Sequence, residues 1–161
     1  MQKQRLQKYI DDTAQADEDI FLDGKDLDGI VFPSMLTSNL NFTSCKLQGC
    51  TLPKRVEGYL ALSYLDIEGV TLPEYIGGNV YLREINLSLF NQHPNYMAST
   101  RIGSRTTNCL YIKDKKLFRT GCFIGAADKF ISEVIERHGK ESFYYEQYFD
   151  FVTLCTTNHA Q

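Results

Sequence analysis

Residues 20–87 read IFLDGKDLDGIVFPSMLTSNLNFTSCKLQGCTLPKRVEGYLALSYLDIEGVTLPEYIGGNVYLREINL, and this stretch repeats itself every twenty residues. Apolar residues recur at that interval in three columns, and glycines and prolines recur between them. These residues are Ile20, Leu40, Leu60 and Val80; Leu22, Phe42, Leu62 and Leu82; Leu27, Leu47, Ile67 and Leu87; Gly29, Gly49 and Gly69; and Pro33, Pro53 and Pro73. A fixed period of this length is typical of a solenoid, whose coils bury their apolar faces against one another.

Each repeat contains an apolar–x–apolar triplet, such as Leu60-Ala61-Leu62, that predicts a short strand with alternate side chains pointing inward. Four such strands stacked in parallel predict one sheet. The glycines in register suit bends that need a positive φ, and the prolines close each repeat without an amide donor. Cys45 and Cys50 fall in apolar columns, which predicts that both thiols pack in the core rather than at a metal or redox site.

One repeat unit and the C-terminal part of the chain resemble a known family. The unit LPEYIGGNVYL at 72–82 is similar to the leucine–proline, glycine–glycine repeat of leucine-rich-repeat-like phage and prophage proteins. These proteins also carry a segment that resembles RIGSR at 101–105, TGCF at 120–123 and a helix ending in His138-Gly139. Residues 37–38 lack the glycine pair, so the first repeats depart from the pattern. The resemblance implies a phage or prophage origin and brings no catalytic residues with it.

The remainder of the chain is expected to close the two ends of the repeat. We predict an N-terminal capping helix over residues 1–18, the repeat solenoid over 19–92 and a ββαα segment over 93–161. The expected fold class is α+β: a short leucine-rich-repeat-like parallel β-solenoid of about four coils, with a capping helix before it and a β-hairpin plus two helices after it.

The C-terminal segment is expected to begin with a connector and a hairpin. Residues 88–100 lose the twenty-residue period and contain Pro94, which predicts a connector. Residues 108–113 alternate in hydropathy, a KDKK turn follows, and residues 117–124 can return as the second strand.

Two helices should follow the hairpin. Residues 126–138 place an apolar face along one side of a helix that ends at Gly139. The second helix, from about residue 142 to 155, carries six aromatic residues: Phe143, Tyr144, Tyr145, Tyr148, Phe149 and Phe151. No single helical face holds all six, so some should pack inward while others form an interface. We expect Tyr144, Tyr145 and Tyr148 at a partner surface, with a homodimer through this helix as an alternative.

Charge and cysteine usage suggest where the protein works. The formal net charge is -3, but residues 11–28 hold eight carboxylates and residues 101–119 hold six basic side chains. The acidic run is expected to be a solvated face; a mimic of nucleic-acid phosphates or a dock for a basic protein is the alternative. Five cysteines without framework spacing indicate a reducing compartment. Neither a membrane span nor a signal peptide is evident, so we expect a soluble protein in the cytoplasm of a bacterial host cell.

A cysteine-dependent enzyme is one alternative function. It would use Cys122 as the nucleophile, His138 as the base and Glu133 as the group that orients the histidine. These positions are more typical of packing, because Cys122 falls in an expected strand and His138 at a helix end. The sequence contains no metal-ligand spacing, phosphate loop or dinucleotide fingerprint, so we expect no metal and no cofactor.

Contact with nucleic acid is a second alternative. Basic side chains surround Tyr111 and Phe118 in the predicted hairpin region, and they are Arg101, Arg105, Lys113, Lys115, Lys116 and Arg119. Such residues can grip phosphates while a ring stacks on a base. The net negative charge of the chain weakens that interpretation and favours a solvated basic face or a match to an acidic protein.

The outward positions of the predicted strands form the more definite binding surface. They lie in three columns: Asp19, Asn39, Tyr59 and Asn79; Phe21, Asn41, Ala61 and Tyr81; and Asp23, Thr43, Ser63 and Arg83. Repeat proteins bind partners through such faces, although the N-terminal helix could cover this one instead. We expect Tyr59, Tyr81 and Arg83 to anchor a protein partner. The sequence thus favours a noncatalytic binding module, and the phage resemblance suggests that it sterically blocks a host or defence protein complex.

Overall fold

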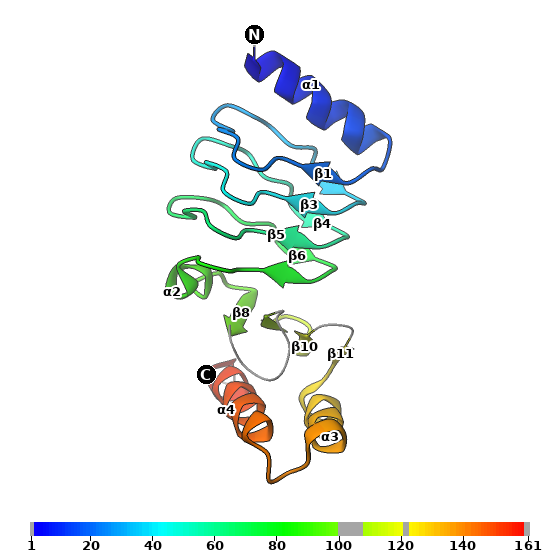
Figure 1. The fold of residues 1–161 in the computed structure, drawn as a ribbon, viewed down its shortest axis with the longest axis vertical. Coiled ribbons are helices and arrows are strands. Elements are labelled where there is room, and N and C mark those ends of the chain that lie inside the picture. The colour runs from blue at the N-terminus through cyan, green and yellow to red at the C-terminus, as the bar shows by residue number, and fades with distance from the viewer. Residues whose placement is uncertain (1, 100–107, 121–122, 160–161) are drawn as a thin grey trace. The chain divides into compact units, whose positions relative to one another are not determined.

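A computed structural model describes residues 2–99, 108–120 and 123–159 of the chain. These ranges form a mixed α/β structure with parallel sheets and with helices at both ends of the chain (Figure 1). The chain divides into two compact units, Met1–Leu89 and Phe90–Gln161. None of the helices in these ranges is long and apolar enough to cross a lipid bilayer.

The first unit is built on a parallel ladder that follows the twenty-residue period. Its main sheet has the order β1-β3-β5-β7, and the strands are β1 (Ile20–Phe21), β3 (Leu40–Asn41), β5 (Leu60–Ala61) and β7 (Val80–Tyr81). Ile20 pairs with Leu40, Leu40 with Leu60, and Leu60 with Val80. The first residue of each strand is buried, because it points into the core between the repeats. The predicted strands and their parallel register are confirmed.

A second parallel sheet runs along the same repeats, so the prediction of one sheet is wrong. It has the order β2-β4-β6, with strands β2 (Met35–Leu36), β4 (Arg55–Val56) and β6 (Tyr75–Ile76). The buried residue of each strand falls in another apolar column, Leu36, Val56 and Ile76, each at most 1% exposed. The twenty-residue period therefore also holds for the buried residues of this sheet. Its strands could not be recognised in the sequence, because each has only two residues and is flanked by charged and turn residues.

Two columns of the repeat have a left-handed backbone. Gly29, Gly49 and Gly69 have φ angles of 82°, 80° and 73°, which confirms the predicted bends. The other column begins with a glycine and continues with larger residues: Gly24, Ser44, Tyr64 and Glu84 have φ angles of 71°, 61°, 59° and 55°. A left-handed conformation costs a residue with a side chain about 1 kcal/mol or more. Ser44, Tyr64 and Glu84 adopt it despite this cost, so the second bend is not reserved for glycine.

Helix α1 (Gln2–Gln15) lies over the first repeat and completes hydrogen bonds at its edge. The Gln7 side-chain amide nitrogen donates to the backbone carbonyl oxygen of Val31 at 2.7 Å, and the Val31 N–H donates to the side-chain oxygen Oε1 of Gln7 at 3.0 Å. Val31 pairs on its other side with Thr51 of the next repeat. Gln7 thus supplies the donor and acceptor that the backbone of a further repeat would supply, while Ile10 buries its side chain completely.

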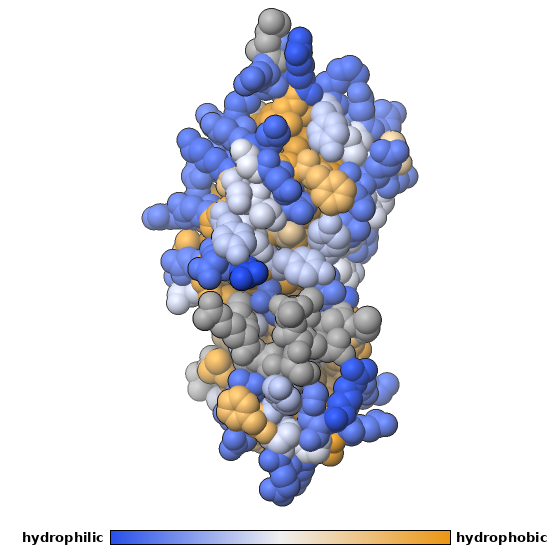
Figure 2. Space-filling model, in the orientation of Figure 1, coloured by the Kyte–Doolittle hydropathy of each residue, from blue (hydrophilic) through white to orange (hydrophobic). Residues whose placement is uncertain are grey.

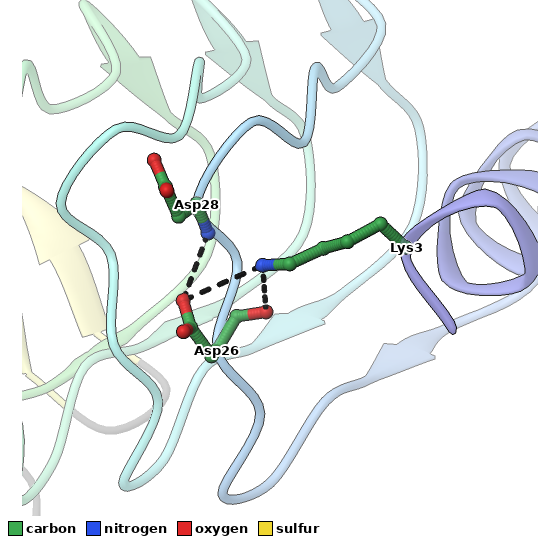
Figure 3. A network of polar contacts seen from close by, with 3 residues as sticks. All are labelled: Lys3, Asp26 and Asp28. Atoms are coloured by element: carbon green, nitrogen blue, oxygen red, sulfur yellow. Dashed lines mark hydrogen bonds and ion pairs between the residues drawn. The ribbon is translucent and has the colours of Figure 1, made fainter. Parts of the chain in front are cut away.

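Lys3 makes a second contact between α1 and the first repeat (Figure 3). Its ammonium group donates to the Asp26 carbonyl oxygen at 2.8 Å and lies 3.5 Å from the Asp26 carboxylate. The same carboxylate accepts a hydrogen bond from the Asp28 N–H. That hydrogen bond, with the nearby ammonium groups of Lys3 and Lys46, lowers the pKa of Asp26. The carboxylate therefore stays ionised at neutral pH and can pair with the Lys3 ammonium group.

The second unit contains a four-stranded antiparallel sheet rather than the predicted hairpin alone. Its order is β11-β10-β9-β8, and the strands are β8 (Tyr96–Ser99), β9 (Cys109–Ile112), β10 (Leu117–Thr120) and β11 (Phe123–Gly125). The β9–β10 hairpin and the intervening turn at 113–116 are confirmed, with Ile112 opposite Leu117. However, β11 pairs back onto β10, so the predicted second strand at 117–124 is two strands.

The residues predicted as a connector also carry regular structure. They include most of α2 (Leu87–Phe90) and all of β8, which pairs with β9 from Tyr96 to Ser99. In β8 the buried Tyr96 and Ala98 alternate with half-buried neighbours. The sequence YMAS lacks the β-branched residues that usually mark a strand, and it follows an Asn- and Pro-containing loop, so local preference did not reveal it.

Helices α3 (Ala127–His138) and α4 (Phe143–His159) contribute to the core of the second unit. Phe118 of β10 lies edge-on to Phe130 of α3, with ring centroids 5.3 Å apart, and to Phe151 of α4 at 6.1 Å. Gly139 ends α3 with a φ of 81° and donates its N–H to the carbonyl oxygen of Ile135, as the sequence predicted. Ile135, one of the apolar residues of α3, is 37% exposed.

Candidate functional site

The predicted binding residues of the repeat lie in or beside β5 and β7 of the β1-β3-β5-β7 sheet, where they take part in two ring contacts. The rings of Tyr59 and Tyr81 meet edge to face, with centroids 5.6 Å apart and an angle of 85° between their planes. The guanidinium carbon of Arg83 lies 5.8 Å from the centroid of the Tyr64 ring. We call these four residues the tyrosine face. Arg83 is exposed, and Tyr64 is 48% exposed, so part of the cluster is open to a partner.

Tyr64 was not predicted as a binding residue. It occupies the left-handed column, where the first repeat has Gly24, and its φ is 59°. A bulky residue in this conformation is unusual and costs about 1 kcal/mol or more. The chain nevertheless places a large, half-exposed ring at this position beside Arg83. The twenty-residue alignment contained the signal, since Tyr64 is the only aromatic residue in a column shared with Gly24, Ser44 and Glu84.

The electrostatic surroundings of Tyr59 connect the tyrosine face to the acidic first repeat. Burial raises the pKa of the Tyr59 hydroxyl most, and the negative charges of Asp19 and Asp23, together with Tyr81, raise it further. The hydroxyl thus remains protonated and can donate a hydrogen bond. Carboxylates at one end and Arg83 at the other give this face a charge gradient along the sheet.

Several other members of the predicted outward columns stabilise the repeat instead of facing a partner. Asp19 accepts the N–H of Asn39 at 3.0 Å, and Asn39 in turn accepts the N–H of Tyr59 at 2.7 Å. Ser63 accepts the N–H of Arg83 at 3.1 Å. Ala61, predicted to point outward, is only 6% exposed because it lies between larger neighbours in the register. These contacts hold successive repeats together.

The three predicted tyrosines of α4 occupy different environments. Tyr144 is 38% exposed, and its ring lies 4.9 Å from the ring of His138. Tyr145 is half-buried and stacks on Phe149 at 5.6 Å. Tyr148 is only 3% exposed and packs against Phe130, so its expected position at a partner surface is wrong. The reason is geometric: Tyr148 lies on the same helical side as the buried Phe151, Val152 and Cys155.

The basic residues of the nucleic-acid alternative do not surround an exposed ring. Tyr111 is 2% exposed and Phe118 is fully buried, because both rings pack in the core of the second unit. A base therefore cannot stack on either ring. The alternation of apolar and polar residues predicted the two strands of the hairpin correctly. It did not show which face of the sheet would pack against the helices.

Three of the cations lie in the β9–β10 turn, and a fourth lies on β10. Lys113 donates to the carbonyl oxygen of His93 at 3.3 Å, whereas Lys115 and Lys116 are exposed in the turn. Arg119 is half-buried on β10. Arg101 and Arg105 lie outside the residues that the structure describes.

The proposed catalytic constellation is only partly visible, since Cys122 also lies outside those residues. Glu133 accepts a hydrogen bond from Arg137 at 3.0 Å, so an arginine rather than His138 is its partner. The cavity beside these side chains measures about 30 Å³, far less than the several hundred cubic ångströms of a typical ligand pocket. In the ranges that the structure covers, no group of three or more His, Cys, Asp or Glu side chains is arranged to hold a metal ion.

The four cysteines within the described ranges are not disulfide-bonded to one another. Cys45 is buried as predicted, but Cys50 is partly exposed. In the apolar column of Cys50, Ile30 of the first repeat is buried, whereas Val70 of the third is also only half-buried. Burial raises the pKa of Cys50 to about 12 and that of Cys155 to about 12. The pKa of Cys109, almost completely buried, also rises well above its usual value. Such thiols are poor nucleophiles at neutral pH.

These pKa values predict slow thiol chemistry. In a Cys122→Ser variant, Cys50 and Cys155 should react with a thiol-specific disulfide reagent at pH 8 about 1000-fold more slowly than a free thiol, because their thiolate fraction is that much smaller. The folded-state pKa values of these two thiols lie above the unfolded ones. Their contribution to the free energy of unfolding is therefore fully present below about pH 9 and is lost as the pH rises towards 12. Denaturant should make the thiols reactive; rapid labelling of either cysteine in the native protein would contradict the structure.

Comparisons of the chain with protein-family models, with curated proteins and with solved structures found no match. The arrangement of side chains therefore carries the functional argument.

Proposed function

We propose that this chain is a noncatalytic protein-binding module and that the tyrosine face is its contact surface. The observation that carries the proposal is the edge-to-face pair of Tyr59 and Tyr81, and the same two repeats also place Arg83 over the Tyr64 ring. Tyrosine and arginine supply much of the binding energy at protein interfaces, since they combine a large apolar area with hydrogen-bonding groups. The paired strands beneath them provide a firm platform, so little conformational entropy is lost on binding.

A repeat architecture suits this role. Our proposal includes a leucine-rich-repeat-like solenoid of about four coils, which the twenty-residue register of the two parallel sheets supports. In such an architecture each repeat adds one row of side chains to a continuous surface. Specificity then depends on the residues that differ between rows, such as Tyr59, Tyr81 and Arg83.

The biological setting of the proposal rests on the resemblance to phage and prophage proteins. In that setting the chain acts in the cytoplasm of a bacterial host cell, where it occupies a host or defence protein complex and blocks it sterically. A blocker of this kind needs an accessible recognition surface but no catalytic group. The half-exposed tyrosines and the exposed Arg83 supply such a surface.

Affinity capture from a bacterial host lysate tests the proposal when the tyrosine face is altered selectively. The test variant is Tyr59→Ala with Tyr81→Ala, and the matched control is Met35→Ala with Tyr75→Ala on the β2-β4-β6 sheet. Loss of an interface anchor typically weakens binding by about 2 kcal/mol, or about 30-fold. We expect a protein retained in stoichiometric amount by the unaltered chain to be lost from the test variant and kept by the control.

Two results would contradict this function. One is equal retention of the same protein by both double variants, which would place the contact elsewhere. The other is recovery of nucleic acid alone, with binding that weakens steeply as salt rises, which would favour the basic residues of the second unit.

A further inference from the structure

A groove between α1 and the first repeat is a second site, separate from the tyrosine face. It encloses about 610 Å³, within the range of typical ligand pockets. Its apolar lining comes from Leu6 and Tyr9 of α1 and from Phe21 of β1, and its charged lining includes Lys3, Arg5 and Lys25. Figure 2 shows apolar surface exposed between hydrophilic side chains in the region of α1 and the first repeat. We call this site the α1 groove.

Two aromatic rings of the α1 groove are open to solvent. Tyr9 is 41% exposed, although the next residue of α1, Ile10, is completely buried. Phe21 is 53% exposed, because it is the outward residue of β1 and the preceding Ile20 takes the inward position. Exposed rings in a concave site are typical of surfaces that receive an apolar group.

Positive charge dominates the lining of the α1 groove. The ammonium group of Lys3 is held by Asp26, which is the only acidic residue among the described residues that line the groove. Across the described part of the chain, the Arg5 guanidinium and the Lys25 ammonium group have no hydrogen-bond or ion-pair partner. Two cations beside exposed rings therefore complement an apolar group that carries a negative charge nearby.

The wider surroundings limit the size of that ligand. Residues 11–28 hold eight carboxylates, and all of them are exposed. An extended polyanion such as a nucleic acid would reach beyond the α1 groove. Its outer phosphates would then lie near these carboxylates, which would repel them. A short segment with one or two negative charges can instead keep its charge on Arg5 and Lys25.

We infer that the α1 groove binds a short acidic peptide segment in which an aliphatic or aromatic side chain neighbours Asp or Glu. The apolar side chain lies against Phe21 and Tyr9, while the carboxylate pairs with Arg5 and Lys25. This interaction is independent of the proposed function, because none of these residues belongs to the tyrosine face.

Fluorescence anisotropy with a labelled tetrapeptide probe, Asp-Leu-Phe-Glu with blocked termini, tests the inference. The charge control is the same peptide with lysine in place of both acidic residues. We expect Arg5→Glu to weaken binding of the acidic probe about 10-fold and Phe21→Ala to weaken it about 30-fold. Lys54→Glu, a charge reversal at an exposed lysine that does not line the groove, should change the affinity less than twofold.

Four outcomes would overturn the inference: no saturable binding of the acidic probe, equal binding of the lysine probe, an equal loss in the Lys54→Glu variant, or tighter binding of an oligothymidine at the same residues. Backbone amide shifts in nuclear magnetic resonance spectra should localise the bound probe to the residues around Tyr9 and Phe21. Failure of this test leaves the capture experiment unaffected, since none of the variants in that experiment alters a residue of the α1 groove.

Discussion

Replacement of Gly78 by alanine is expected to lower the free energy of unfolding by about 3 kcal/mol. A methyl group on Gly78 would lie 2.6 Å from the carbonyl carbon of Gly58 and 2.6 Å from the backbone nitrogen of Tyr59. Both atoms belong to the backbone of the preceding repeat and cannot rotate away. The repeats would therefore have to separate locally, which weakens the hydrogen bond from the Gly78 N–H to the Gly58 carbonyl oxygen.

Gly69→Ala is the matched control for this effect. Gly69 has a φ of 73°, but no atom lies within 4 Å of the position that a methyl group would take. The cost there comes only from the left-handed backbone, and we expect about 1 kcal/mol. Urea denaturation followed by circular dichroism measures both values. Equal losses in the two variants would show that the close approach of successive repeats at Gly78 is not as tight as the structure indicates.

Phe42→Ala should have a comparable or larger effect, about 4 kcal/mol. Phe42 is completely buried, and its ring lies edge-on to that of Phe32 with the centroids 5.3 Å apart. Removal of the ring leaves a cavity between successive repeats and also removes the aromatic pair. The closely packed strands on either side can collapse into that space only partly, so most of the lost packing energy is not recovered.

Phe21→Ala provides the control for Phe42 with the same chemical change. Phe21 is 53% exposed, and its alanine variant should stay within about 0.5 kcal/mol of the unaltered protein. A large loss of stability at Phe21, or a loss below about 1 kcal/mol at Phe42, would contradict the assignment of inward and outward faces along the repeat.

The parallel ladder of the first unit could be predicted because its period is written directly in the sequence. Residues twenty positions apart, such as Leu40 and Leu60, pair in the structure. The twenty-residue period therefore predicted both the strand register and the buried positions. The same alignment contained Leu36, Val56 and Ile76, but their two-residue strands lacked enough alternation to be recognised.

The glycines of the later repeats mark a close approach of successive backbones. Gly78 approaches the backbone at Gly58, and Gly58 approaches the backbone at Ser38. A larger side chain at position 58 or 78 would push these repeats apart.

The candidate site was less predictable, because it depends on how side chains turn and on contacts distant in sequence. The columns predicted that Tyr59, Tyr81 and Arg83 share a face, but not that Tyr59 and Tyr81 would pair or that Tyr64 would join Arg83. In the second unit, the sequence did not show which side of α4 would be buried, because Tyr148 packs against Phe130 of α3 in a core that also contains residues of β9 and β10.

Site-specific photocrosslinking tests the central claim most directly. A benzoylphenylalanine residue at position 81 would report a partner at the tyrosine face, and the same residue at position 75 would report one at the β2-β4-β6 sheet. The proposed function predicts a strong crosslink to a host protein from position 81 and little or none from position 75. Equal crosslinking from both positions, or a crosslink from position 75 alone, would contradict it.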